Sequence, residues 1–218
     1  MKILYVLLPI IIALWLRIWR WYFASNVPKP KTTIIKQISD NIQIRETKAQ
    51  VYASITVTSS ESEAPNKAFN ILAWYIFGNN TSKSKLAMTA PVISQKETKE
   101  QDEVSEKIAM TAPVITQKSS ESEYTVSFVM PQWYTLQTLP TPNDSRINIY
   151  EVLPKKIIVI QFNGYTTQDR INKYNQELTN TIKTENITTT WEYIIAQYND
   201  PRTPRFMRTN EIWIEISK

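Results

Sequence analysis

The chain has 218 residues and a mass of 25.4 kDa, of which 42% are hydrophobic and 21% are charged, as in a globular protein rather than a disordered one. It has no cysteine and no histidine, which excludes disulfides, thiolate or imidazole metal ligands and histidine-based catalytic triads. Its two glycines, Gly78 and Gly164, are too far apart for a glycine-rich phosphate loop. These absences favour a binding protein over an enzyme.

The net charge of +5 belongs to the N-terminal segment. Residues 1–39 hold six basic residues and no acidic one, so the remainder carries 25 − 6 = 19 basic against 20 acidic residues, a net charge of −1. A body without basic excess has no general affinity for phosphate backbones, and we expect no nucleic-acid partner. The basic end instead suits a membrane surface.

The first 23 residues read as a hydrophobic anchor helix or a signal. Ile3 to Leu16 is an uncharged apolar run between Lys2 and Arg17, shorter than the roughly 20 residues of a full span unless it extends through the tryptophan-rich residues to Phe23. An uncleaved anchor and a cleaved signal peptide both stay open, as does the side of the membrane. Residues 24–37, with two prolines and three lysines, read as a linker.

The body then alternates strand and helix signals. Apolar residues recur every second position over 42–58, which predicts two strands, and at helical spacing over 65–77, with Gly78 as the helix stop. Strand-like sequence follows at 124–131, and 139–145 reads as a connector.

The order of elements repeats after residue 146. Ile147, Ile149 and Glu151 repeat the I-x-I-x-E spacing that begins at Ile42. The segments that follow are a strand at 156–163, a helix at about 168–183 opened by a Thr166–Asp169 capping box, and strands at about 191–198 and 211–216. The pattern predicts an α+β domain of two pseudo-symmetric β-β-α-β-β halves.

A shorter repeat lies inside the first half. Residues 85–96 (KLAMTAPVISQK) and 107–118 (KIAMTAPVITQK) share ten of twelve residues. Two similar strands packed in a sheet would explain the repeat, and so would an element that contacts a ligand twice.

The first helix carries more apolar surface than one packed face requires. Phe69, Ala73 and Phe77 lie on a face adjoining the core stripe, with Trp74 beside them. Such a second face is covered by a loop, a protein, a membrane or a flat apolar ligand. A ligand groove along the helix would be edged by cations from Lys83, Lys85, Lys107, Arg205 and Arg208.

The segment 198–211 (YNDPRTPRFMRTNE) has two interpretations. Its prolines stiffen a loop whose arginines are solvated, or Arg205 and Arg208 flank Phe206 and Met207 at the rim of a ligand groove. Asn210 and Glu211 are assigned to structure.

Five segments together resemble the SOUL haem-binding family: FNILAWYIFGNN, KIAMTAPV, YTVSFVMPQWYTLQTLPTPND, QFNGY and YNDPRTPRFMRTNEIWIEI, in the order that family has them. The resemblance covers residues 38–218. It implies a distorted β-barrel with two helices and non-covalent binding of haem or another tetrapyrrole at an apolar surface near the first helix.

The residues we expect at that site supply an apolar face and cations. A macrocycle needs a flat apolar contact, and its propionates need basic side chains. Because there is no histidine, an axial iron ligand would come from Tyr75, Met88 or Met110, or be missing. The expected ligand-binding residues are Phe69, Ala73, Trp74, Phe77, Lys85, Met88, Met110, Arg205, Phe206 and Arg208.

The leading hypothesis is therefore a membrane-tethered protein that binds or carries a tetrapyrrole and has no catalytic activity. One alternative is a module of the same fold that binds another amphipathic ligand or docks a partner protein through its aromatic helix face. An enzyme would need paired carboxylates, for which Glu46 and Glu151 are candidates.

Overall fold

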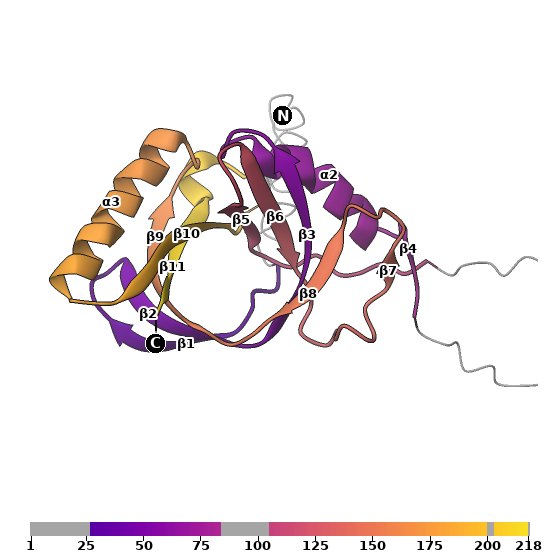
Figure 1. Ribbon diagram of the computed structural model, residues 1–218, viewed down its shortest axis with the longest axis horizontal. Helices are drawn as coiled ribbons and strands as arrows, with labels where there is room; N and C mark the ends of the chain where they lie inside the picture. The colour runs from indigo at the N-terminus through magenta and orange to yellow at the C-terminus, as the bar shows by residue number, and fades with distance from the viewer. Residues whose placement is uncertain (1–26, 84–104, 200–202, 218) are drawn as a thin grey trace, which may run out of the picture. The chain divides into compact units, whose positions relative to one another are not determined.

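The computed structural model describes residues 27–83, 105–199 and 203–217 (Figure 1). The chain divides into two compact units. Unit 1 comprises Met1–Lys48, Thr111–Ile115 and Lys155–Lys218, and unit 2 comprises Ala49–Met110 and Thr116–Pro154. The expected anchor at 1–23 and the first repeat copy at 85–96 lie outside the described residues. Within the described ranges, no helix has the length and apolarity to cross a membrane.

Unit 1 is an antiparallel sheet with one helix on it. The strands follow the order β1-β2-β9-β11-β10, and α3 packs against β9 and β11 (Figure 1). The elements are β1 (Thr32–Gln37), β2 (Ile42–Thr47), β9 (Lys156–Asn163), α3 (Gln168–Thr184), β10 (Thr189–Gln197), the 3-10 turn η1 (Arg205–Met207) and β11 (Thr209–Ile216).

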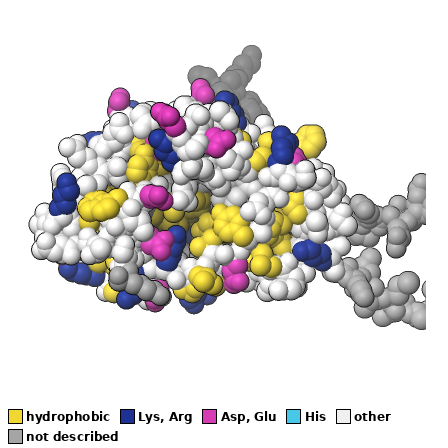
Figure 2. Space-filling view, viewed as in Figure 1, with side chains coloured by type: hydrophobic (Ala, Val, Ile, Leu, Met, Phe, Trp, Pro, Cys, Tyr) yellow, Lys and Arg dark blue, Asp and Glu magenta, His cyan; other side chains and the backbone are white. Residues whose placement is uncertain are grey.

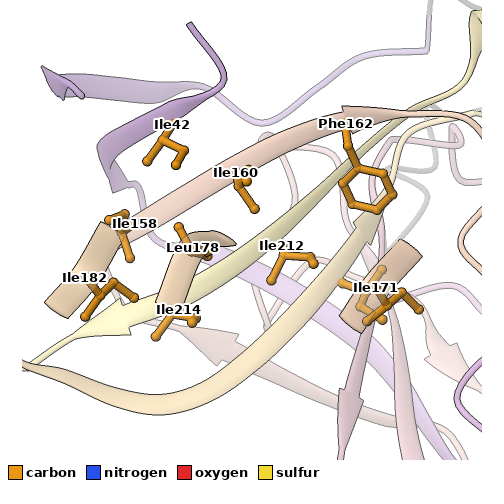
Figure 3. Close-up of a cluster of buried hydrophobic side chains, with 10 residues drawn as sticks. Ile42, Ile158, Ile160, Phe162, Ile171, Leu178, Ile182, Ile212 and Ile214 are labelled. Carbon is orange, nitrogen blue, oxygen red and sulfur yellow. The ribbon is translucent and has the colours of Figure 1, made fainter. Parts of the chain in front are cut away.

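The core of unit 1 lies between the helix and the sheet. Ile171, Leu178 and Ile182 project from one side of α3, as the helical spacing predicts, and are at most 1% exposed. They meet strand residues drawn in Figure 3, including Ile42 of β2, Ile160 of β9 and the ring of Phe162. The close packing of branched side chains makes this cluster the main source of stability in unit 1.

Unit 2 repeats the plan around α2 (Ala64–Ile76), which packs against β3 and β6. Its sheet has the order β5-β6-β3-β8, and two residues of β4 pair with two of β7. The strands are β3 (Gln50–Thr58), β4 (Asn80–Thr81), β5 (Val114–Lys118), β6 (Glu123–Val129), β7 (Thr141–Pro142) and β8 (Asn148–Val152). The expectation of an α+β fold with two helices is therefore confirmed for the described residues. The barrel implied by the family resemblance stays a prediction.

The strands carrying the I-x-I-x-E repeat pair differently from what consecutive halves would suggest. Strand β2 pairs with β9, with Ile42 opposite Ile160, whereas β8 pairs with β3, with Glu151 opposite Val51. Each half of the sequence thus gives its first strand to the sheet of the other half. In unit 1, the N–H of Thr47 donates to the carbonyl of Lys155 (2.9 Å). This bond joins the end of β2 to the residue just before β9.

Two local features differ from the sequence expectation. The end of the expected linker, 24–37, is strand β1, since the β-branched run from Thr32 to Ile35 pairs with β2. The Thr166–Asp169 capping box does not form, because Thr167 is the N-cap of α3 and the Thr166 hydroxyl instead accepts a hydrogen bond from Gln197 (2.8 Å). Gly78 does end α2, with φ of +119° that favours glycine.

Candidate functional site

The apolar residues of α2 divide between the core and the surface of unit 2. Phe69 contacts Phe128 of β6 edge-on with ring centroids 5.4 Å apart, and Ala73 is buried, so both belong to the packed side. Trp74 and Phe77 point outward and are 70% and 58% exposed. In Figure 2, hydrophobic side chains reach the surface among scattered charges. Of the four residues expected on a second apolar face, only Trp74 and Phe77 are therefore exposed.

The segment that starts at Ser105 runs along the C-terminal end of α2. The N–H of Ile108 donates to the carbonyl of Ile76 (2.8 Å), and a Cβ on Gly78 would meet the Ser105 hydroxyl at 3.4 Å. Lys107 lies between these two contacts in the sequence and is exposed. Met110 follows three residues later and is half-buried.

The side chain of Asn80 links the C-terminal end of α2 to the segment that starts at Ser105; we call this region the α2 junction. Its side chain is 1% exposed, and its Nδ2 donates to the carbonyls of Tyr75 (2.7 Å) and Glu106 (2.8 Å) while its Oδ1 accepts from the Glu106 N–H (3.0 Å). The Glu106 carboxylate accepts from the hydroxyls of Tyr134 (2.5 Å) and Ser82 (3.1 Å). Sequence reasoning singled out neither Asn80 nor Glu106, because no periodicity marks a loop residue that bonds to a helix end.

Two tyrosines at the α2 junction, Tyr75 and Tyr134, have raised pKa values and are therefore neutral phenols at physiological pH. Tyr75 is fully buried and donates to the carbonyl of Pro140 (2.8 Å), and burial raises its pKa well above the usual value. Burial and the hydrogen bond to Glu106 raise the pKa of Tyr134 to about 12. A tyrosinate ligand for iron is therefore disfavoured at Tyr75, and the described residues contain no cluster of three metal-binding His, Cys, Asp or Glu side chains.

The other expected ligand-binding residues lie in unit 1 or outside the described residues. Arg205 and Phe206 are in η1, exposed, and Arg208 directly follows it. Lys85 and Met88 lie outside the described residues. The candidate carboxylates Glu46 and Glu151 are exposed on strands of different units.

Asn210 and Glu211 are buried, in agreement with a structural role. The Asn210 side chain donates to the carbonyl of Gly164 (2.8 Å). The Glu211 carboxylate accepts from Arg45 (3.0 Å), the Tyr198 hydroxyl (2.7 Å) and the Trp213 indole (2.7 Å). This network accounts for part of the C-terminal family motif without a ligand.

A family model described as "SOUL heme-binding protein" matches residues 27–105 and 98–215 of the chain. The two matches meet between the copies of the twelve-residue repeat. No curated protein matches significantly.

Several solved structures share the fold. The EcmrR C-terminal domain is 10% identical over 81% of this chain and 97% of its own, with a TM-score of 0.53. A hydrolase from Listeria innocua is 12% identical over 88% of this chain and 94% of its own, with a TM-score of 0.51. At these identities the likeness shows the fold alone.

Proposed function

Because the chain belongs to the SOUL heme-binding protein family, we propose that it binds haem or a related tetrapyrrole non-covalently at the exposed end of α2. The observation that carries the proposal is the pair Trp74 and Phe77, two large aromatic side chains that are exposed at the end of a helix whose other apolar residues are buried or partly buried. Water contact with so much apolar surface is unfavourable, and a flat apolar ring would relieve it.

Unit 2 also carries lysines that would suit the propionates of a tetrapyrrole. Lys107 is exposed in the segment whose Ile108 bonds to the end of α2, and the ammonium group of Lys83, in the same unit, donates to the carbonyl of Leu136 (3.0 Å). Carboxylates of a ligand that lies on Trp74 and Phe77 would form charge-assisted hydrogen bonds with such groups. The aromatic pair of the protein would contact a flat apolar ring, and its lysines would contact carboxylates. The ligand we propose is therefore planar, amphipathic and anionic.

The proposal does not require a protein side chain that ligates the haem iron. Haem would bring a redox-active iron, but the chain has no histidine or cysteine, and Tyr75 and Tyr134 are held as phenols. Met110 is the remaining candidate within the described residues. Recognition then rests on the ring and its carboxylates, so iron-free protoporphyrin should bind within about tenfold of haemin, a difference of about 1.4 kcal/mol.

A titration of the detergent-solubilised full chain with haemin and with protoporphyrin tests the proposal. Phe77→Asp should weaken both by about tenfold or more, because it places a carboxylate where the ring and its propionates would lie. Leu153→Asp is the matched control, since Leu153 is 70% exposed in the same unit. Equal affinity of the Phe77→Asp variant and the unmodified protein, or an equal loss in both variants, would refute the site.

We also propose that the anchor segment, residues 1–23, holds the protein at a membrane. The support is the apolar run with flanking basic residues and three tryptophans. In high salt, which screens any charge-dependent lipid contact of the folded body, deletion of residues 1–23 should move the protein from the membrane fraction to the soluble fraction. A truncated protein that stays in the membrane fraction would show that another part of the chain binds lipid.

A further inference from the structure

The most exposed large hydrophobic side chain in the described part of the chain belongs to unit 1, away from the α2 site in the sequence. Phe206 is 79% exposed and its neighbour Met207 is 45% exposed. Both lie in η1, which joins β10 to β11 together with flanking residues. We call Arg205, Phe206, Met207 and Arg208 the 205–208 tip.

The backbone around this tip is held firmly. The N–H of Met207 donates to the carbonyl of Pro204 (3.0 Å), and the N–H of Arg208 donates to that of Arg205 (3.3 Å). The Arg208 side chain donates to the carbonyl of Thr203 (2.7 Å), and its own carbonyl accepts from Gly164 (3.1 Å). Because these bonds fix the turn, Phe206 and Met207 are presented outward by a formed structure rather than by a loose loop.

An aromatic neighbour extends the surface of the tip. The Arg208 guanidinium lies over the ring of Tyr165, 4.5 Å from its centroid, and Tyr165 is itself 46% exposed. Aromatic rings with one polar end partition to the interface between lipid headgroups and acyl chains. Phenylalanine and methionine beside them supply the purely apolar part.

The charge of the segment is of one sign. Residues 201–208 (PRTPRFMR) contain three arginines, and no carboxylate occurs between Asp200 and Glu211. An exposed apolar pair flanked in the sequence by Arg205 and Arg208 is complementary to a bilayer with anionic headgroups, where the apolar side chains enter the interface and the exposed Arg205 guanidinium contacts phosphate. Aromatic residues, methionine and arginine are also enriched in protein interfaces, so the test below measures docking to lipid in the absence of any partner protein.

We infer that the 205–208 tip is a membrane-docking site, with Phe206 and Met207 inserted into the interface of an anionic bilayer and Arg205 bound to lipid phosphate. The inference does not depend on tetrapyrrole binding. It also differs from the anchor at residues 1–23, because it assigns a second lipid contact to the folded unit 1. With both contacts, unit 1 would be held at the bilayer in one orientation.

The absence of native cysteine makes a site-specific probe possible. We would place an environment-sensitive fluorophore on Met207→Cys in the full chain, and on Thr184→Cys at the exposed end of α3 as the control position. Each labelled protein is reconstituted into vesicles of phosphatidylcholine alone or with phosphatidylglycerol, some carrying a lipid-attached quencher. Since the full chain is present in every sample, the contribution of residues 1–23 is constant.

Docking predicts a blue shift and lipid quenching at position 207 in vesicles with phosphatidylglycerol, reversed by high salt, and neither at position 184. In the Met207→Cys background, Phe206→Ser should abolish the shift, and Arg205→Gln should lower the ratio of docked to undocked protein about fivefold. Lys183→Gln, an equal loss of charge on α3, should leave the ratio unchanged.

Three results would overturn the inference. The label at position 207 would stay in a water-like environment with both lipid mixtures, or it would respond equally without anionic lipid. Alternatively, it would respond to haemin in the absence of lipid, which would assign the tip to the ligand site instead. Circular dichroism of each variant checks that the fold is retained.

Discussion

Replacing the buried Glu211 with glutamine should destabilise the protein more than any surface charge change. The side chain is 5% exposed and accepts hydrogen bonds from the 14%-exposed Arg45, from Tyr198 and from Trp213. The variant keeps the size of the side chain but removes its charge. Arg45 is then left with a positive charge in a mostly dry environment and without its carboxylate partner.

The expected loss is about 3 kcal/mol in the free energy of unfolding, the lower end for breaking a buried ion pair. For a protein of this size, that corresponds to a fall of about 6 to 12 °C in Tm. Urea unfolding followed by tryptophan fluorescence measures the first quantity, and calorimetry measures the second. The double variant Glu211→Gln with Arg45→Gln should lose less than the sum of the single losses, by about 1 to 3 kcal/mol.

The exposed pair Lys36–Glu185 is a matched control within the same unit. Its atoms are 2.7 Å apart, but the side chains are 55% and 33% exposed, so Glu185→Gln should cost less than about 1 kcal/mol. Equal losses for Glu211→Gln and Glu185→Gln would show that the buried network does not stabilise the fold and would refute the structural assignment of Glu211.

Three further predictions concern stability. Leu178→Ala should cost about 3 kcal/mol by opening a cavity in the unit 1 core, whereas Leu153→Ala at an exposed position should cost almost nothing in the same urea assay. Gly78→Ala should cost about 1 to 3 kcal/mol, because its φ of +119° strains any side-chain-bearing residue; an unchanged Tm would contradict this. The pKa of Tyr134 rises from 10.0 to about 12 on folding, so its stabilisation is present below about pH 10 and declines towards pH 12. Tyr134→Phe should flatten the loss of stability over that window, and an unchanged slope would show that another group titrates there.

The strands and helices of the body were predictable because each carries its own periodicity. Alternation located β2 and β3, and helical spacing located α2 and α3 to within about two residues. The pairing of β2 with β9 was not predictable, since the I-x-I-x-E pattern fixes which side chains face the core but not which strand lies alongside. Strand β1 was missed because nearby prolines and lysines outweighed its four β-branched residues.

The candidate site was predictable only in part. The apolar excess of α2 is visible in the sequence, but which of its residues stay exposed depends on what packs against each side of the helix. Phe69 is partly covered by its edge-on contact with Phe128, whereas Trp74 stays 70% exposed. The contacts between Asn80 and Glu106 join residues that are far apart in the chain, and no local sequence pattern predicts them.

The pairing of β2 with β9 and of β8 with β3 has a consequence for synthesis of the protein. Every strand of unit 2 is translated after β2 and before β9. Ile42 of β2 is separated by 118 residues in the sequence from its partner Ile160 in β9. Unit 2 can close on the ribosome once residue 154 has emerged, whereas the β1–β2 hairpin then still has one edge whose backbone groups lack their β9 partner. A translational pause or premature stop in this interval leaves that edge free to pair with another nascent chain, so chaperone demand should be greatest just before β9 appears.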